Sequence, residues 1–127
     1  MKIAVHGKEF DRVSAPFIAR IFEIFTQSKA DILVSSNFTK YLKKSRIKAR
    51  FKTYQTGKEL SRVQLFISIG GDGTLLESIT HIGKSEIPVL GINTGRLGFL
   101  ANISREETEH ALQSVLMELI NWIHGHC

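Results

Sequence analysis

A glycine-rich segment with one aspartate at its centre is the part of this sequence best suited to chemistry. Gly70-Gly71-Asp72-Gly73-Thr74 directly follows an apolar, β-branched run at residues 63–69, which predicts a buried strand. The residues from Leu75 onward have the composition of a helix. A loop between a strand and a helix aims backbone N–H groups at a phosphate. Because a carboxylate repels phosphate, we interpret Asp72 as a group that takes a proton or holds a cation, and the combination predicts phosphoryl transfer.

A simpler interpretation is that Asp72 only caps the following helix, since aspartate is a good N-cap. A capped turn needs one or two glycines, whereas three surround this aspartate. We therefore favour the functional interpretation, in which the glycines let the main chain approach phosphate oxygens and Thr74 adds a hydroxyl. Asp72 would orient or deprotonate an attacking hydroxyl. We expect no metal ligands from the protein itself, because Mg²⁺ would be carried mainly by nucleotide phosphates.

A second glycine-bearing loop, Asn93-Thr94-Gly95-Arg96-Leu97-Gly98-Phe99-Leu100, follows an apolar run at residues 87–92. It can be a loop that needs flexible turns and tucks Phe99 into the core. It can also be a wall of a nucleotide site, with Phe99 offering its face to an adenine or nicotinamide ring. Its expected place beside the first loop, at the end of a neighbouring strand, favours the second interpretation.

The elements that must position these loops alternate along the chain. Because strands alternate with helices and glycine loops follow the strands, the pattern predicts an α/β fold with a parallel sheet. In such sheets ligands bind beyond the carboxyl ends of the strands, where both loops lie. We expect Ser14 to cap the first helix, and we interpret His6, His81 and His110 as surface or boundary residues. The expected strands are 3–5, 31–35, 47–54, 63–69 and 87–92, and the expected helices are 15–28, 38–44, 75–82 and one beginning near the capping box at 104–107.

Length and composition fit one ordinary globular domain. The 127 residues are 43% hydrophobic and 23% charged, which argues against global disorder. The only cysteine, Cys127, excludes an internal disulfide and favours a reducing compartment. No secretory signal and no apolar run of about 20 residues is visible, so we expect a cytoplasmic protein without a membrane partner.

The excess positive charge is concentrated in residues 40–52, which hold seven of the 17 basic residues and no acidic one. Such a segment can attract nucleic acid or another polyanion. From Arg46 to Lys52, however, charged residues alternate with apolar ones, as in an amphipathic strand with one wet face. We favour a solvated face over a nucleic-acid site.

The two loops together resemble the NAD kinases, most specifically over residues 67–101. The Gly-Gly-Asp-Gly motif also occurs in diacylglycerol and sphingosine kinases, with a close relative in 6-phosphofructokinases, and the second motif separates the families. The resemblance implies phosphoryl transfer from ATP or inorganic polyphosphate, with a divalent cation, to the adenosine ribose 2′-hydroxyl of NAD. Asp72 resembles the proton acceptor. The residues expected to bind cofactor or substrate are Gly70, Gly71, Asp72, Gly73, Thr74, Asn93, Phe99 and Leu100.

The resemblance also implies a Rossmann-like domain at residues 1–116, followed in the family by an all-β domain. Residues 117–127 do not match the family, so we expect an atypical tail, a missing second domain and a truncated or frame-shifted chain. His124, His126 and Cys127 in this tail make only a weak candidate metal site. The full-length form would be a homo-oligomer. A lipid kinase domain, or a nucleotide-binding fragment without activity, stays open as an alternative.

Overall fold

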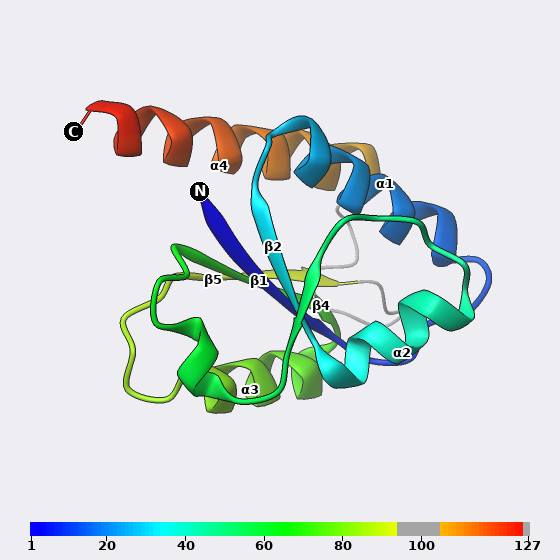
Figure 1. Ribbon diagram of the computed structural model, residues 1–127. Coiled ribbons are helices and arrows are strands. Elements are labelled where there is room, and N and C mark those ends of the chain that lie inside the picture. Colours follow the sequence, from blue (N-terminus) through cyan, green and yellow to red (C-terminus); the bar gives the residue numbers. More distant parts are fainter. Residues whose placement is uncertain (94–104, 126–127) are drawn as a thin grey trace.

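The chain forms a five-stranded, wholly parallel sheet with helices on both faces, as the alternating pattern predicts (Figure 1). The computed structural model describes residues 1–93 and 105–125. The strands are β1 Lys2–Gly7, β2 Asp31–Ser35, β3 Lys52–Tyr54, β4 Leu65–Gly70 and β5 Val89–Asn93. The helices are α1 Ala15–Gln27, α2 Ser36–Lys44, α3 Asp72–Ile82 and α4 Arg105–Gly125, with one turn of 3₁₀-helix, η1, at Gly57–Leu60.

The strand order is β3-β2-β1-β4-β5. The chain builds outward from β1 to β3, then returns across the sheet to place β4 on the other side of β1. The order therefore reverses between β1 and β4, which makes their carboxyl ends the topological switch point of the sheet. In open α/β sheets the crevice at this point is where ligands bind.

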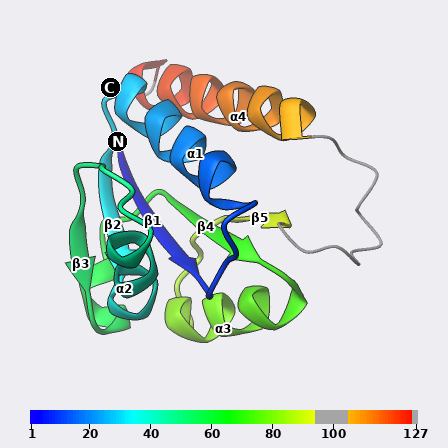
Figure 2. The same cartoon turned by 90° about the vertical axis from the view of Figure 1, so that its right-hand side faces the viewer.

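Helices α1 and α4 cover one face of the sheet and α3 covers the other (Figure 2). The larger core lies on the first side and includes six buried apolar residues of α1: Phe17, Ile18, Ile21, Phe22, Ile24 and Phe25. Leu112 and Leu116 of α4 belong to the same core. A smaller cluster on the second side joins Ala4 and Phe66 of the sheet to Ile82 of α3. Two packed faces leave the loops at the carboxyl edge free for a ligand.

The prediction of a strand at 47–54 is wrong in length, because only Lys52–Tyr54 pair with β2. The alternation in this segment nevertheless describes burial correctly. Ile47, Ala49 and Phe51 pack against the core, while the intervening basic residues are exposed. An alternation of apolar and polar residues therefore indicates an extended segment with one buried face. It does not show whether the segment is hydrogen-bonded to a neighbouring strand.

The helix ends correct two further expectations. Ser14 is the residue before α1, but its side chain makes no capping hydrogen bond, because its backbone is already helical (φ −82°, ψ −20°). Helix α3 begins at Asp72, three residues before the predicted start. Gly83 ends α3 with φ of 63°, a conformation that favours glycine. Helix α4 continues through residue 117 to Gly125. In the described part of the chain, no helix is long and apolar enough to cross a membrane.

Candidate functional site at the carboxyl edge of the sheet

The two loops predicted from the sequence are brought together by strand pairing. Gly70 at the end of β4 is the register partner of Asn93 at the end of β5. On the other side of β4, Ile69 is the register partner of Gly7, the last residue of β1. The glycine loop therefore begins between the ends of β1 and β5, at the switch point, and the prediction that both loops start at neighbouring strand ends is confirmed.

Gly70 has a structural reason to be glycine. Its φ of 151° lies outside the range that side chains tolerate, and a Cβ there would lie 2.5 Å from Thr74 Oγ1. Thr74 is only 2% exposed. In this conformation the Thr74 side chain therefore supports the turn from inside the fold.

Gly71 and Gly73 have no such reason. Among the described residues beyond its chain neighbours, a Cβ at Gly71 would meet nothing within 4 Å, and one at Gly73 would approach Lys8 Nζ at an ordinary contact distance of 3.6 Å. Neither has a positive φ. Both are exposed, so the space beside them is open. Gly71 is the N-cap of α3, where glycine is more favourable than alanine, whereas Gly73 lies in the first turn, where glycine costs up to about 1 kcal/mol relative to alanine. The open space at both positions favours a role in close approach to a ligand.

The N-terminus of α3 faces the same open space. Asp72 is the first residue of the helix, and Leu75 N–H donates to Gly71 O at 3.2 Å. The N–H groups before Leu75 have no acceptor within the helix. They carry the partial positive charge of the helix dipole, which suits an anion such as phosphate. The predicted phosphate cradle at Gly70–Thr74 therefore has a suitable backbone.

The predicted NAD wall is described only at its beginning. Asn93 is the last residue of β5, so its main chain lies beside the glycine loop. Phe99 and Leu100 lie outside the described residues, and their roles stay predictions.

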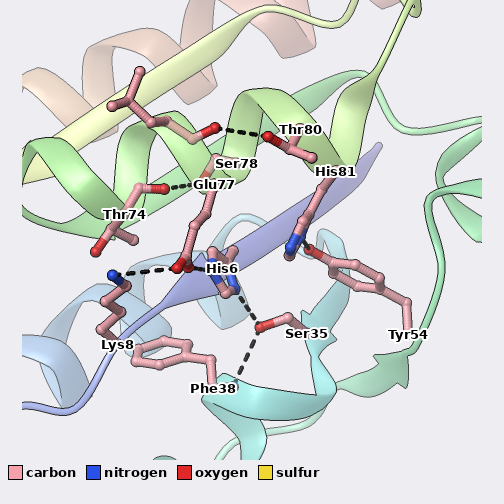
Figure 3. A network of polar contacts seen from close by, with 11 residues as sticks. His6, Lys8, Ser35, Phe38, Tyr54, Thr74, Glu77, Ser78, Thr80 and His81 are labelled. Carbon is pink, nitrogen blue, oxygen red and sulfur yellow. Dashed lines mark hydrogen bonds and ion pairs between the residues drawn. The ribbon is translucent and has the colours of Figure 1, made fainter.

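A buried histidine network at this edge was missed by the sequence analysis (Figure 3). His6 on β1 is 1% exposed, so the expectation of a surface or boundary position is wrong. Its Nδ1 lies 2.7 Å from Ser35 Oγ, and its Nε2 lies 2.9 Å from Glu77 Oε2. The available signal was the strand itself, because a central strand of a parallel sheet is buried on both faces and takes even a polar residue inside.

The hydrogen bonds define the direction of this network. An ionised carboxylate only accepts, so His6 Nε2 carries the proton that is donated to Glu77. Ser35 Oγ accepts the Phe38 N–H at 3.2 Å and thereby caps α2. In the neutral imidazole, Nδ1 then accepts from the Ser35 hydroxyl. The order Ser35–His6–Glu77 is that of a nucleophile–base–acid triad, but Ser35 is 3% exposed and committed to the cap, so we assign it a structural role.

Glu77 extends the network to the surface. Its Oε1 lies 3.2 Å from Lys8 Nζ, and both side chains are about half exposed, at 47% and 51%. The hydrogen bond from His6, assisted by Lys8, lowers the pKa of Glu77 below its ordinary value. Glu77 is therefore ionised at neutral pH and holds the Lys8 ammonium beside the first turn of α3.

A second pair lies on the far side of His6. The His6 and His81 ring centroids are 4.4 Å apart, and His81 Nδ1 lies 2.8 Å from the Tyr54 hydroxyl. Burial raises the pKa of Tyr54 and lowers the pKa of His81. Tyr54 therefore donates its O–H to a neutral His81.

Protein ligands for a metal are not gathered in the described part of the chain. Within residues 1–93 and 105–125, no group of three or more His, Cys, Asp or Glu side chains could hold an ion.

Comparison with known proteins places these features in a family. Residues 7–120 match the model of the ATP-NAD kinase N-terminal domain. Over 118 residues the chain is 38% identical to the NAD kinase of Christiangramia forsetii and 39% identical to that of Cytophaga hutchinsonii. Each match covers 91% of this chain and 40% of the relative, so the chain spans about two fifths of the length of the relatives it matches.

A solved structure confirms the fold. Yeast NADH kinase complexed with NADH superimposes with a TM-score of 0.73 over 92% of this chain and 36% of the yeast chain. The sequence identity is 19%. This likeness supports the architecture of the sheet and its helices.

Proposed function

The chain belongs to the NAD kinase family, and from this premise we propose that it carries the phosphate-binding half of an enzyme that phosphorylates NAD to NADP. The observation that carries the proposal is the pair Gly71 and Gly73. Both lie at the N-terminus of α3, beside the switch point, with open space where side chains would be. No steric contact requires glycine at either position, whereas close approach of phosphate oxygens does.

In the proposed reaction, Asp72 accepts the proton of the adenosine ribose 2′-hydroxyl of NAD. The 2′-oxygen forms a bond to the terminal phosphorus of ATP or inorganic polyphosphate. The bond from that phosphorus to its bridging oxygen breaks, so ADP or a shortened polyphosphate leaves with the electron pair. Backbone N–H groups of Gly70, Gly71, Gly73 and Thr74 stabilise the charge on the transferred group.

Mg²⁺ enters this proposal as part of the metal–phosphate substrate. It neutralises charge on the phosphate chain, which favours attack by the 2′-oxygen. No step requires a protein-held metal.

The NAD side of the site is proposed from the second motif. The main chain of Asn93 lies beside Gly70, which supports an NAD wall continuing from β5 through Phe99 and Leu100. Phe99 would place its ring against the adenine. The complete enzyme is proposed to be a cytoplasmic homo-oligomer that acts on small molecules and does not bind nucleic acid.

NADP formation tests the proposal directly. The assay supplies NAD, Mg²⁺ and either ATP or polyphosphate to two proteins. One is the 127-residue chain, and the other is this chain fused to the C-terminal part of the Christiangramia forsetii enzyme. Asp72→Asn is the test variant. Asp31→Asn is the matched control, because Asp31 is an exposed aspartate at the opposite, amino-terminal end of β2.

We expect NADP from the fused protein and its control, and a loss of at least about 100-fold in Asp72→Asn, the usual size of a lost general base. Failure of both proteins to make NADP with either donor would contradict the proposal. Phosphorylation of diacylglycerol without NADP would support the lipid kinase alternative. Nucleotide binding without turnover would support the inactive-fragment alternative.

A further inference from the structure

Lys8 places a positive charge beside the open side of the glycine loop. It is the first residue after β1, on one side of the switch point, while the loop follows β4 on the other. Its Nζ lies 3.6 Å from the position that a Cβ at Gly73 would take. An ammonium group thus lies beside the first turn of α3, where the dipole already favours an anion.

The ion pair between Lys8 and Glu77 adds too little to the stability of the fold to explain why Lys8 lies here. Both side chains are about half exposed, and exposed pairs contribute only about 0–1 kcal/mol. Glu77 also has a buried hydrogen-bond partner, His6, on its other carboxylate oxygen. The network therefore anchors Glu77 from inside the fold. Lys8 is the outermost residue of the network and can be replaced without removing that anchor.

The ammonium of Lys8 remains able to bind a ligand. It has three N–H donors, and the contact with Glu77 uses one of them. Lys8 also lines a pocket of about 530 Å³ at the same edge, together with Gly7, Asn37, Tyr41 and the carboxylates of Glu9 and Glu77. A phosphate chain that lies on the glycine loop can therefore reach Nζ from open space.

We propose that Lys8 binds the phosphate chain of the phosphoryl donor where it leaves the glycine loop, and that Glu77, held by His6, positions the ammonium for this contact. The inference rests on the proposed function for the identity of the donor. It adds a binding residue contributed by β1, outside both glycine motifs. Lysine acts here as a point charge on phosphate oxygens.

The test measures binding of inorganic tripolyphosphate to the full 127-residue chain by calorimetry, without NAD and without turnover. The variants are Lys8→Gln, which removes the charge, and Lys8→Arg, which keeps it. Lys84→Gln is the control, since Lys84 follows the opposite end of α3, about 16 Å away at about 1.5 Å per residue. Circular dichroism and thermal unfolding check that all variants are folded.

Loss of one charge-assisted hydrogen bond predicts that Lys8→Gln raises the Kd at least about fivefold. Lys8→Arg should retain most of the affinity, and Lys84→Gln should stay within about twofold, because its charge is screened at this distance. Unchanged affinity in Lys8→Gln, an equal loss in Lys84→Gln, or no saturable binding to the unaltered chain would overturn the proposal.

The outcome is separable from that of the NADP assay. If tripolyphosphate binds through Lys8 but no NADP forms, the proposed function fails and the assignment of Lys8 stands. If the fused protein makes NADP while Lys8→Gln leaves both the Kd for tripolyphosphate and the KM for ATP unchanged, the assignment of Lys8 alone fails.

Discussion

His6 Nε2 lies 2.9 Å from Glu77 Oε2, and this contact ties the end of β1 to the middle of α3, 71 residues later in the chain. The two residues lie on elements that meet at the switch point of the sheet. Because the glycine loop forms the N-terminus of α3, a constraint on Glu77 is also a constraint on the direction of the loop. The buried contact between His6 and Glu77 therefore helps to fix the orientation of α3 and of the glycine loop at its N-terminus.

Replacing Glu77 with glutamine should change the acid sensitivity of folding. The pKa of Glu77 is lowered in the folded state, so the unfolded chain binds this proton more readily. The stabilisation is present above the ordinary value of 4.5 and is lost as pH falls through the lowered pKa. Urea unfolding from pH 7 to pH 3 should show the unaltered chain losing its advantage over Glu77→Gln only below about pH 4.5.

Glu118→Gln is a suitable control for that series, because Glu118 is exposed on α4. Its stability curve should run parallel to that of the unaltered chain. A constant difference between the unaltered chain and Glu77→Gln at every pH would contradict the assignment.

Removing the Ser35 hydroxyl should destabilise the fold more than an ordinary surface change. Ser35 caps α2 through the Phe38 N–H and is also the partner of buried His6. Ser35→Ala removes the cap and leaves His6 Nδ1 without its partner, at a combined cost of about 1–4 kcal/mol. Urea unfolding of Ser36→Ala, one residue further into α2 and partly exposed, gives the matched control. Equal stability of the two variants would count against the network.

The fold was predictable because its signals are local. Every strand except β3 contains a short apolar run and each helix carries apolar residues at helical spacing, so periodicity indicated the alternation and hence the parallel sheet. The length of β3 could not be predicted from the local sequence. Whether residues 47–51 join the ladder depends on a partner strand, which the alternation of Ile47, Ala49 and Phe51 does not specify.

The candidate site likewise has one part that the local sequence predicts and one part that it does not. The glycine loop is contiguous in sequence, so its chemistry could be inferred before its structure was known. His6, Ser35 and Glu77 come from three separate elements, and only the pairing of β1 with β2 and the packing of α3 on the sheet bring them together. No spacing rule connects them, so the network could not be found from the sequence.

His81 should make the fold sensitive to mildly acidic pH. Its pKa is lowered mainly by burial, with a smaller contribution from His6 and an opposing one from Glu77. The unfolded chain therefore takes up this proton first, and the folded state loses stability as pH falls below the ordinary value of 6.5. Stability measured by urea unfolding between pH 8 and pH 5.5 should fall less in His81→Gln than in the unaltered chain.

His110→Gln should leave that pH dependence unchanged, because His110 is exposed on α4. If His110→Gln flattens the curve and His81→Gln does not, the buried pair of Tyr54 and His81 is not the source of the effect.

Alanine substitutions in the glycine loop should separate folding from function. Gly73→Ala should leave the free energy of unfolding unchanged or raise it by up to about 1 kcal/mol, because its added Cβ meets no close contact and alanine favours the helix. Gly71→Ala should lower it by about 1 kcal/mol at most, because Gly71 is the N-cap of α3, where alanine is less favourable than glycine. Both should weaken tripolyphosphate binding and NADP formation if phosphate lies against the loop.

Gly70→Ala should instead destabilise the fold by about 1–3 kcal/mol, because φ is 151° and Thr74 occupies the space. Urea unfolding and calorimetry on the same three proteins make the comparison. Full phosphate binding in Gly71→Ala and Gly73→Ala would mean that the open space beside α3 is not where the phosphate binds, because the added methyl groups would then obstruct nothing.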